Sequence, residues 1–192
     1  MKKEIILIGM GGHCNACIDV IENTGKFKIA GLIAKNASVK NKNLKYKTLG
    51  TDADLKKIFN KYKYAHVAIG QIKNLDLRKK IFEKLKKIGF VLPTIISKNS
   101  YVSKQSSIGE GTIIMHDSII NYNAKIGVNS IINSKALIEH DCIIGSHTHV
   151  STGCILNGKT VIGDQCFIGS SSVSKGNKKI KNKTFVKMLS KI

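Results

Sequence analysis

Residues 108–173 divide into the sixes IGEGTI, IMHDSI, INYNAK, IGVNSI, INSKAL, IEHDCI, IGSHTH, VSTGCI, LNGKTV, IGDQCF and IGSSSV. Each hexad begins with an aliphatic residue, from Ile108 to Ile168, and its fifth residue is small. A period of six fits neither an α-helix nor an alternating strand. It is typical of a β-solenoid in which each hexad forms one flat side.

A second period groups the hexads into turns. Ile-Gly pairs begin at residues 108, 126, 144 and 162, a spacing of 18. Three hexads therefore make one triangular turn, with the aliphatic residue inside and the small residue beside it near the corner. About four such turns bury little surface on their own, so association through the flat sides is physically reasonable.

The sequence before the repeat alternates between strand and helix patterns. We expect strands at 4–9, 27–33, 65–69 and 90–96, and helices at 14–23, 52–62 and 74–88. Asp52 is the expected cap of the second helix, and Gly89 ends the third. This order predicts a small, parallel, Rossmann-like α/β domain over 1–98, the repeat domain over 99–173, and a lysine-rich tail over 174–192.

Composition excludes several classes of protein. With 192 residues, 42% hydrophobic and 23% charged, the chain is neither disordered nor fibrous. The apolar stretch Ile5–Ile8 is too short to insert into a membrane, and Glu4 interrupts the basic start of a secretion signal, so we expect a cytoplasmic protein. Five scattered cysteines indicate thiols, and without a second CxxC, Cys14 and Cys17 are read as packing residues of a helix start rather than metal ligands.

The formal net charge of +20 is unevenly distributed. Residues 1–99 hold 21 Lys and Arg against seven acids, residues 100–173 hold four lysines against five acids, and residues 174–192 hold seven lysines and no acid. Such charge suits phosphorylated small molecules or nucleic acid. Arg78 is the only arginine, however, and arginine makes the bidentate contacts to phosphate and guanine, so nucleic acid is not the expected partner.

A glycine-rich turn, Gly9-Met-Gly11-Gly12-His13, follows the first predicted strand and opens the first helix. Backbone N–H groups at this position can receive a phosphate. Cys14 stands where a dinucleotide fingerprint needs its third glycine, and the second strand ends in Ala34-Lys35-Asn36 without the ribose-binding acid, so NAD is not the expected ligand. A nucleotide-sugar phosphate is favoured over a tight turn without a ligand.

Three histidines, at positions 140, 147 and 149, fall within ten residues of the repeat. In Glu139-His140-Asp141 an outward imidazole has a carboxylate beside it. A carboxylate fixes the tautomer of an imidazole and suits a general base working near neutral pH. On spacing alone, a solvated histidine of the outer face is an equally good interpretation.

Taken together, the motifs resemble those of bacterial sugar acetyltransferases, which modify nucleotide-linked amino sugars or sialic acids. The resemblance covers about residues 3–173, and its motifs are Gly9–His13, Ala68-Ile-Gly70, the hexads, Ile138-Glu-His-Asp-Cys142 and His149-Val-Ser-Thr-Gly153. It implies a left-handed parallel β-helix, a homotrimer and acetyl-CoA as co-substrate.

The resemblance also implies roles for single residues. His140 is the general base, Asp141 orients it, and the Gly158 N–H receives the oxyanion. His149 and Ser170 contact acetyl-CoA in the groove between subunits. The sugar nucleotide is expected at Gly11, Gly12, His13, Lys35, Asn36 and Gly70, where Lys35-Asn36 replaces the acidic pair of many relatives. The usual glycine-valine-proline ending is also replaced, by residues 175–192.

The expected function is therefore N-acetylation of a nucleotide-linked amino sugar in surface-glycan biosynthesis. The alternative is O-acetylation of sialic acid or a related nonulosonic acid. We expect no metal cofactor, no insertion of the protein into a membrane and no nucleic-acid partner. Two further hypotheses are a zinc enzyme that recruits His140, His147 and His149 across an interface, and a non-catalytic module that binds nucleic acid through its basic surface.

Overall fold

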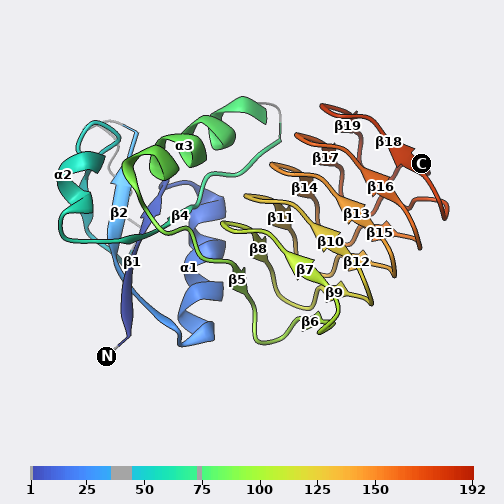
Figure 1. The fold of residues 1–192 in the computed structure, drawn as a ribbon, viewed down its shortest axis with the longest axis horizontal. Helices are drawn as coiled ribbons and strands as arrows, with labels where there is room; N and C mark the ends of the chain where they lie inside the picture. Colours follow the sequence, from blue (N-terminus) through green and yellow to red (C-terminus); the bar gives the residue numbers. More distant parts are fainter. Residues whose placement is uncertain (1, 36–44, 73–74) are drawn as a thin grey trace. The chain divides into compact units, whose positions relative to one another are not determined.

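A computed structural model describes residues 2–35, 45–72 and 75–192, and the chain divides into two compact units (Figure 1). Unit 1 contains residues 1–70 and 77–93, and unit 2 contains residues 71–76 and 94–192. The division lies a few residues before the expected boundary at 98, and the short segment 71–76 belongs with unit 2. No helix of the described residues has the length and apolarity needed to cross a bilayer.

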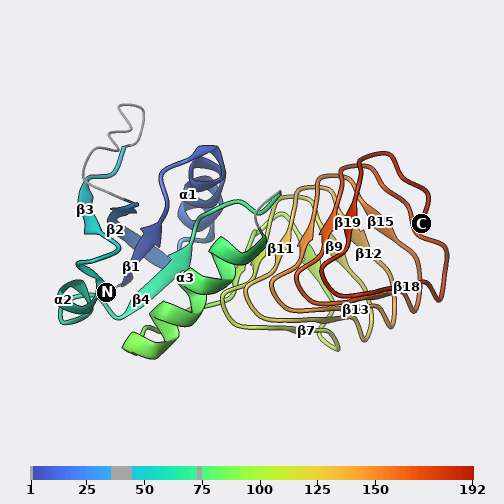
Figure 2. The ribbon, with the colours of Figure 1, turned by 90° about the horizontal axis from the view of Figure 1, so that it is seen from above.

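Unit 1 is built on a parallel four-stranded sheet with the strand order β3-β2-β1-β4. Figure 2 shows α1 and α3 on opposite sides of β1 and β4. The apolar run Ile5–Ile8 is buried because a parallel sheet covered on both faces excludes water from its central strand. The elements are β1 (Lys3–Ile8), α1 (Gly12–Thr24), β2 (Phe27–Ala34), β3 (Thr48–Thr51), α2 (Leu55–Phe59), β4 (Tyr64–Val67) and α3 (Leu75–Ile88).

Three details of unit 1 differ from expectation. Strand β3 was missed, because Thr48–Thr51 is short and lacks a strong apolar pattern. Helix α2 is shorter than 52–62 and begins after Asp54 rather than Asp52. The Asp54 side chain makes no capping hydrogen bond to the helix, but its Oδ2 accepts the Thr51 N–H at 2.8 Å and stabilises the turn before the helix. The expected strand 90–96 is divided between a single bridge from Val91 to Tyr64 and the first strand of unit 2.

Unit 2 is a parallel β-helix of two-residue strands stacked in three sheets. The strand orders are β18-β16-β13-β10-β7, β19-β17-β14-β11-β8-β5 and β15-β12-β9-β6. The predicted fold class, a Rossmann-like α/β domain followed by a left-handed parallel β-helix, is confirmed. The strands are β5 (Ile95–Ile96), β6 (Tyr101–Val102), β7 (Ser107–Ile108), β8 (Ile113–Ile114), β9 (Ile119–Ile120), β10 (Lys125–Ile126), β11 (Ile131–Ile132), β12 (Leu137–Ile138), β13 (Ile143–Ile144), β14 (His149–Val150), β15 (Ile155–Leu156), β16 (Val161–Ile162), β17 (Phe167–Ile168), β18 (Lys179–Ile180) and β19 (Phe185–Val186).

The two sequence periods have direct structural causes. The aliphatic residue of each hexad fills the interior, and equivalent strands of successive turns pair, as Ile126 does with Ile108. The second residue of each turn between strands adopts a left-handed backbone once per hexad, for example Asn123 at φ 57° and Asp141 at φ 58°. A Cβ on Gly109 would stand 2.6 Å from the backbone of the next turn, so the Ile-Gly pairs mark where two turns approach too closely for a side chain.

The segment 174–192 is not a tail, which corrects the expected domain boundary. Strands β18 and β19 pair with β16 and β17, so the β-helix continues to the end of the chain. The repeat is obscured only at Ser174, which is the one polar residue in the buried column between Ile168 and Ile180. Its Oγ accepts the Asn157 N–H at 2.9 Å and lies 2.9 Å from the Thr160 Oγ1, so the hydroxyl is satisfied inside the core.

Candidate active site

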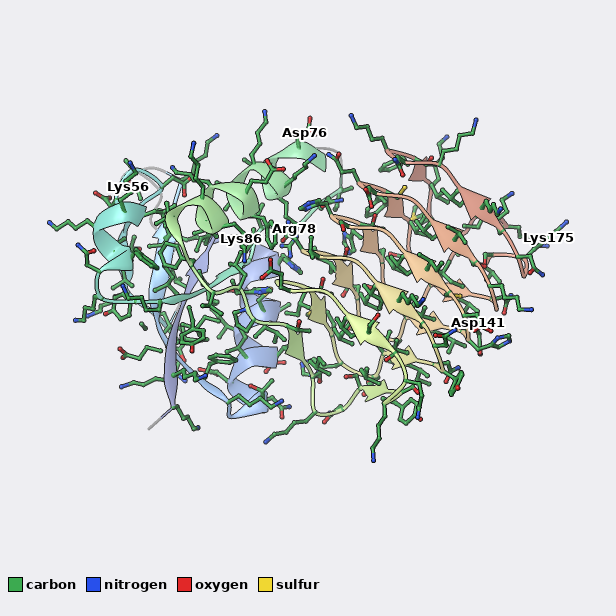
Figure 3. All side chains as sticks on the ribbon, in the orientation of Figure 1. Lys56, Asp76, Arg78, Lys86, Asp141 and Lys175 are labelled. Carbon is green, nitrogen blue, oxygen red and sulfur yellow. The ribbon has the colours of Figure 1, made fainter. Side chains whose placement is uncertain are left out.

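A column of stacked turns at one edge of the β-helix carries His140 and Asp141. The turn between β12 and β13 holds both residues, and Figure 3 shows Asp141 at this outer edge. Backbone bonds fix the column, since the Asp141 N–H donates to the Tyr122 carbonyl at 3.0 Å and the Lys159 N–H donates to the His140 carbonyl at 2.9 Å. The side chains of His140 and Asp141 are 55% and 37% exposed, so both can meet a ligand.

Asp141 holds His140 in one tautomer. The His140 Nδ1 lies 2.9 Å from the Asp141 Oδ2, and the Asn123 Nδ2 donates to the Asp141 Oδ1 at 2.7 Å. These two hydrogen bonds, with the His140 bond the larger, lower the pKa of Asp141 below its usual range. Because an ionised carboxylate only accepts, the proton sits on Nδ1 and the lone pair on Nε2.

Asn123 is a residue that the sequence reasoning missed. It lies one turn of the β-helix before Asp141 and occupies the same left-handed position there. The spacing of the Ile-Gly pairs was the signal that could have placed it beside Asp141. The carboxylate is therefore oriented from both sides, by His140 and by Asn123.

Gly158 adjoins the basic nitrogen. It lies in the turn between β15 and β16, directly above His140 in the next turn of the β-helix, and a Cβ added to it would stand 2.6 Å from the His140 Nε2. Within the described part of the chain, no acceptor is found for the Gly158 N–H. An imidazole lone pair and an available backbone donor are thus neighbours at one exposed corner.

His149 is placed differently from His140. It lies in β14 with 5% of its surface exposed, and its Nδ1 donates to the Gln71 carbonyl at 2.7 Å. Its Nε2 lies 3.3 Å from the Asn133 Nδ2. Gln71, a second residue missed from the sequence, also donates through Nε2 to the His147 carbonyl at 2.6 Å and so is held against the β-helix of unit 2. The expected contact of His149 with acetyl-CoA stays a prediction.

Ser170 follows β17 and places its Oγ 2.9 Å from the Ser151 Oγ. His149 and Ser170 lie on or beside the β14–β17 sheet, whereas His140 lies at the turn between the other two sheets. One chain therefore does not bring His140 together with the two residues expected to contact the coenzyme.

The glycine-rich turn lies at the carboxyl edge of the unit 1 sheet. Gly11 caps α1 with an extended backbone, at φ −89° and ψ −175°, and a Cβ on Gly11 or Gly12 would meet nothing within 4 Å. A Cβ on Gly70 would lie 3.4 Å from the His13 Cβ. Because β1, β2 and β4 are parallel, Gly11–His13, the exposed Lys35 and Gly70 share this edge. Asn36 lies outside the described residues.

Two buried ionisable groups, Arg78 and His66, lie next to the carboxyl edge of the unit 1 sheet. Arg78 is fully buried and donates to the carbonyls of Val67 and Ile69, the latter at 2.9 Å, and burial lowers its pKa to about 10. Burial, with the nearby charges of Arg78 and His13, lowers the pKa of His66 well below its usual range. His66 is therefore neutral, and Arg78 supplies fixed positive charge beneath the carboxyl end of β4.

The two cysteines of α1 are inert thiols, because burial raises the pKa of both Cys14 and Cys17 to about 12. Among the described residues, no cluster of three or more His, Cys, Asp or Glu side chains is arranged to hold a metal ion.

Comparison with known proteins adds a family match and a fold match. Residues 4–85 match the model of the PglD N-terminal domain family. No curated protein matches the sequence. The acetyltransferase domain of PglB from Neisseria gonorrhoeae FA1090 is similar, with a TM-score of 0.90 at 23% identity over 100% of this chain and 91% of that chain.

Two further solved structures share the fold. PerB from Caulobacter crescentus, in complex with CoA and GDP-perosamine, has a TM-score of 0.69 at 24% identity over 98% of this chain and 90% of its own. WeeI from Acinetobacter baumannii AYE has a TM-score of 0.73 at 20% identity over 99% and 94%. The chain therefore has the fold that these proteins share, with a match to the PglD N-terminal domain at residues 4–85 and a left-handed β-helix after it.

Proposed function

We propose that this protein is an acyltransferase that moves an acetyl group from acetyl-CoA to the amino group of a nucleotide-linked amino sugar. The observation that carries the proposal is the corner at which Asp141 holds the His140 Nδ1 while the His140 Nε2 adjoins Gly158. The relatives support it, since the PglB domain was solved with acetyl coenzyme A and PerB with CoA and GDP-perosamine.

The chemistry follows from the geometry of this corner. The His140 Nε2 removes a proton from the acceptor nitrogen as that nitrogen attacks the thioester carbonyl carbon. The carbonyl oxygen becomes an oxyanion, which the Gly158 N–H stabilises. The C–S bond then breaks, and the CoA thiolate takes up the proton that His140 held. A new amide and free CoA thiol result, without a covalent acyl-enzyme.

Unit 1 supplies the features that a nucleotide needs. The Gly11–Gly12 turn exposes backbone without side chains at the start of α1, where the helix dipole favours a phosphate. Lys35 adds positive charge at the same edge. We place the reaction in the cytoplasm, which supplies acetyl-CoA and keeps all five unpaired cysteines reduced.

The acceptor can be tested directly. Purified protein with acetyl-CoA is expected to release free thiol when given a GDP- or UDP-linked 4-amino sugar, and the product is expected to resist mild base because it is an amide. A sialic acid assayed in parallel is the comparison. Activity on the sialic acid alone, with a base-labile ester as product, would replace N-acetylation with the O-acetylation alternative.

We further propose a homotrimer that associates through the β6-β9-β12-β15 sheet. The outward residue of each of these strands is apolar: Tyr101 and Ile119 are exposed, and Leu137 and Ile155 are half-buried. The β7-β10-β13-β16-β18 sheet instead presents Ser107, Lys125, Ile143, Val161 and Lys179, so its apolar side chains are flanked by polar ones. A continuous apolar stripe on one flat side suits contact with another copy, and a closed symmetric trimer would cover all three stripes.

Light scattering is expected to give about three times the monomer mass of 21.0 kDa. Ile119→Lys places a charge in the stripe and is expected to shift the protein to monomer. Ile143→Lys, the matched change on the neighbouring sheet, is expected to leave the trimer intact. A wild-type protein that stays a monomer at micromolar concentration would remove the trimer from this account.

A further inference from the structure

The last turn of the β-helix, residues 174–192 (the terminal turn), is the most charged surface of unit 2. It carries seven lysines and no acidic residue. Its strands β18 and β19 are each the outermost strand of their sheet, so one side of the turn has no neighbouring strand among the described residues. Figure 3 shows Lys175 at this end of the β-helix. The catalytic corner at His140 uses none of these lysines.

Large apolar side chains stand among the lysines. Phe185, Met188 and Leu189 are 49%, 70% and 75% exposed. The Phe185 ring stacks on Phe167 with centroids 5.0 Å apart, which holds it against the outer face of β17. A solvated end would favour polar residues at these positions, so the three side chains are suited to a surface that is partly apolar.

Leu189 is also backbone-strained. It adopts the left-handed conformation at φ 60°, as the equivalent residue of each hexad does. The other non-glycine residues with positive φ in the described chain are Asp, Asn, Lys, His, Gln or Ser, so Leu189 is the only aliphatic one. A branched apolar side chain in this conformation costs free energy, and its exposure returns none of it by packing. The strain suits a side chain that contacts a binding partner rather than the interior of its own protein.

We propose that the terminal turn docks the protein on an anionic lipid surface. Each lysine near such a surface is attracted by the negative potential of the lipid headgroups. Phe185, Met188 and Leu189 can enter the headgroup region while the lysine stems lie along the interface. Nucleic acid fits less well, because the turn has no arginine for bidentate phosphate contacts and its apolar side chains would find no partner along a duplex backbone.

The proposal does not depend on acetyl transfer. The turn also adjoins a residue expected to contact acetyl-CoA, since the Leu189 N–H donates to the Ser170 carbonyl at 2.9 Å, so the experiment must separate lipid binding from coenzyme binding. A trimer with parallel β-helices would present three terminal turns together and strengthen binding by avidity.

Co-sedimentation of the full chain with vesicles tests the proposal. We expect binding to vesicles of phosphatidylcholine and phosphatidylglycerol in equal parts, weakening as salt is added, and no binding to phosphatidylcholine alone. Lys187→Glu with Lys191→Glu is expected to weaken binding about tenfold or more. The matched control, Lys56→Glu with Lys57→Glu on α2, makes the same charge change in unit 1 and is expected to keep binding.

A second variant separates docking from folding. Leu189→Gly relieves the left-handed strain, so the Tm is expected to stay or rise while vesicle affinity falls several-fold. The proposal is wrong if the wild type does not sediment with anionic vesicles, or if both lysine pairs matter equally. It is also wrong if the terminal lysines change only the KM for acetyl-CoA, only duplex DNA binding, or only self-association through the free strand edges.

Discussion

His140→Ala is expected to lower kcat by about 10²-fold or more, because a positioned general base typically contributes between about 10² and 10⁴. The variant removes the only imidazole that Asp141 holds, and with it the Nε2 lone pair beside Gly158. The side chain is 55% exposed and fills no core, so the Tm is expected to change little. Steady-state kinetics with saturating acetyl-CoA and acceptor, together with thermal unfolding, measure both effects.

Variants of the residues that orient His140 are expected to lower kcat by smaller amounts. Asp141→Asn keeps an acceptor for the Nδ1 proton but loses the charge, so its kcat is expected to fall less than that of His140→Ala. Asn123→Ala leaves Asp141 oriented from one side only and is expected to cost less again. His116→Asn, a histidine at the same position of its own hexad whose Nδ1 faces the Ser97 Oγ at 2.7 Å, is the matched control. Near-normal turnover in His140→Ala would remove the general base from this account.

The β-helix could be predicted from sequence because one spacing controls one structural position. Each aliphatic residue from Ile108 to Ile168 fills the interior, and no long-range information is needed to see it. The predicted repeat ended too early because Ser174 replaces an aliphatic residue, although Ile180, Val186 and Ile192 resume the register. A polar residue in the column is tolerated when its hydroxyl has partners, and those partners, Asn157 and Thr160, can be identified only once the turns are stacked.

The site was predictable only in part, for the same reason. His140 and Asp141 are adjacent in sequence, so their pairing could be expected. Asn123 approaches Asp141 across one full turn, and Gln71 reaches His149 from a distant part of the chain. In unit 1, α2 begins after Asp54 rather than Asp52, because the position of a short edge strand decides where the chain turns. Such contacts follow from tertiary structure and leave little local pattern.

Gly158→Ala is expected to lower kcat by about 10²-fold, because a small misplacement of a catalytic group can cost that much. The new Cβ would stand 2.6 Å from the His140 Nε2 and 2.7 Å from its Cε1, closer than real contacts allow. The His140 imidazole is an exposed side chain and can rotate away from the new Cβ. The backbone need not move, so we expect the fold to be unchanged. Steady-state kinetics measure the expected loss of kcat, and thermal unfolding of the variant measures whether the Tm is unchanged.

Gly176→Ala provides a matched control. Gly176 lies at the same position of the next turn of the β-helix, and its added Cβ would approach only the Gly158 carbonyl oxygen, at an ordinary 3.5 Å. Both glycines lack the left-handed φ that penalises side chains, so neither substitution strains the backbone. Normal turnover in Gly176→Ala with loss in Gly158→Ala would locate the effect at the imidazole.

A double-mutant cycle shows which property of Gly158 matters. Alanine keeps the backbone N–H, so an oxyanion donor at residue 158 would survive the substitution. If Gly158→Ala acts by displacing the imidazole, adding it to His140→Ala is expected to cost almost nothing further, because the group that it displaces is already gone. Fully additive losses would mean that residue 158 acts independently of His140, for example by narrowing the acceptor site. Normal turnover in Gly158→Ala would show that the catalytic orientation of the His140 imidazole differs from its orientation in this structure.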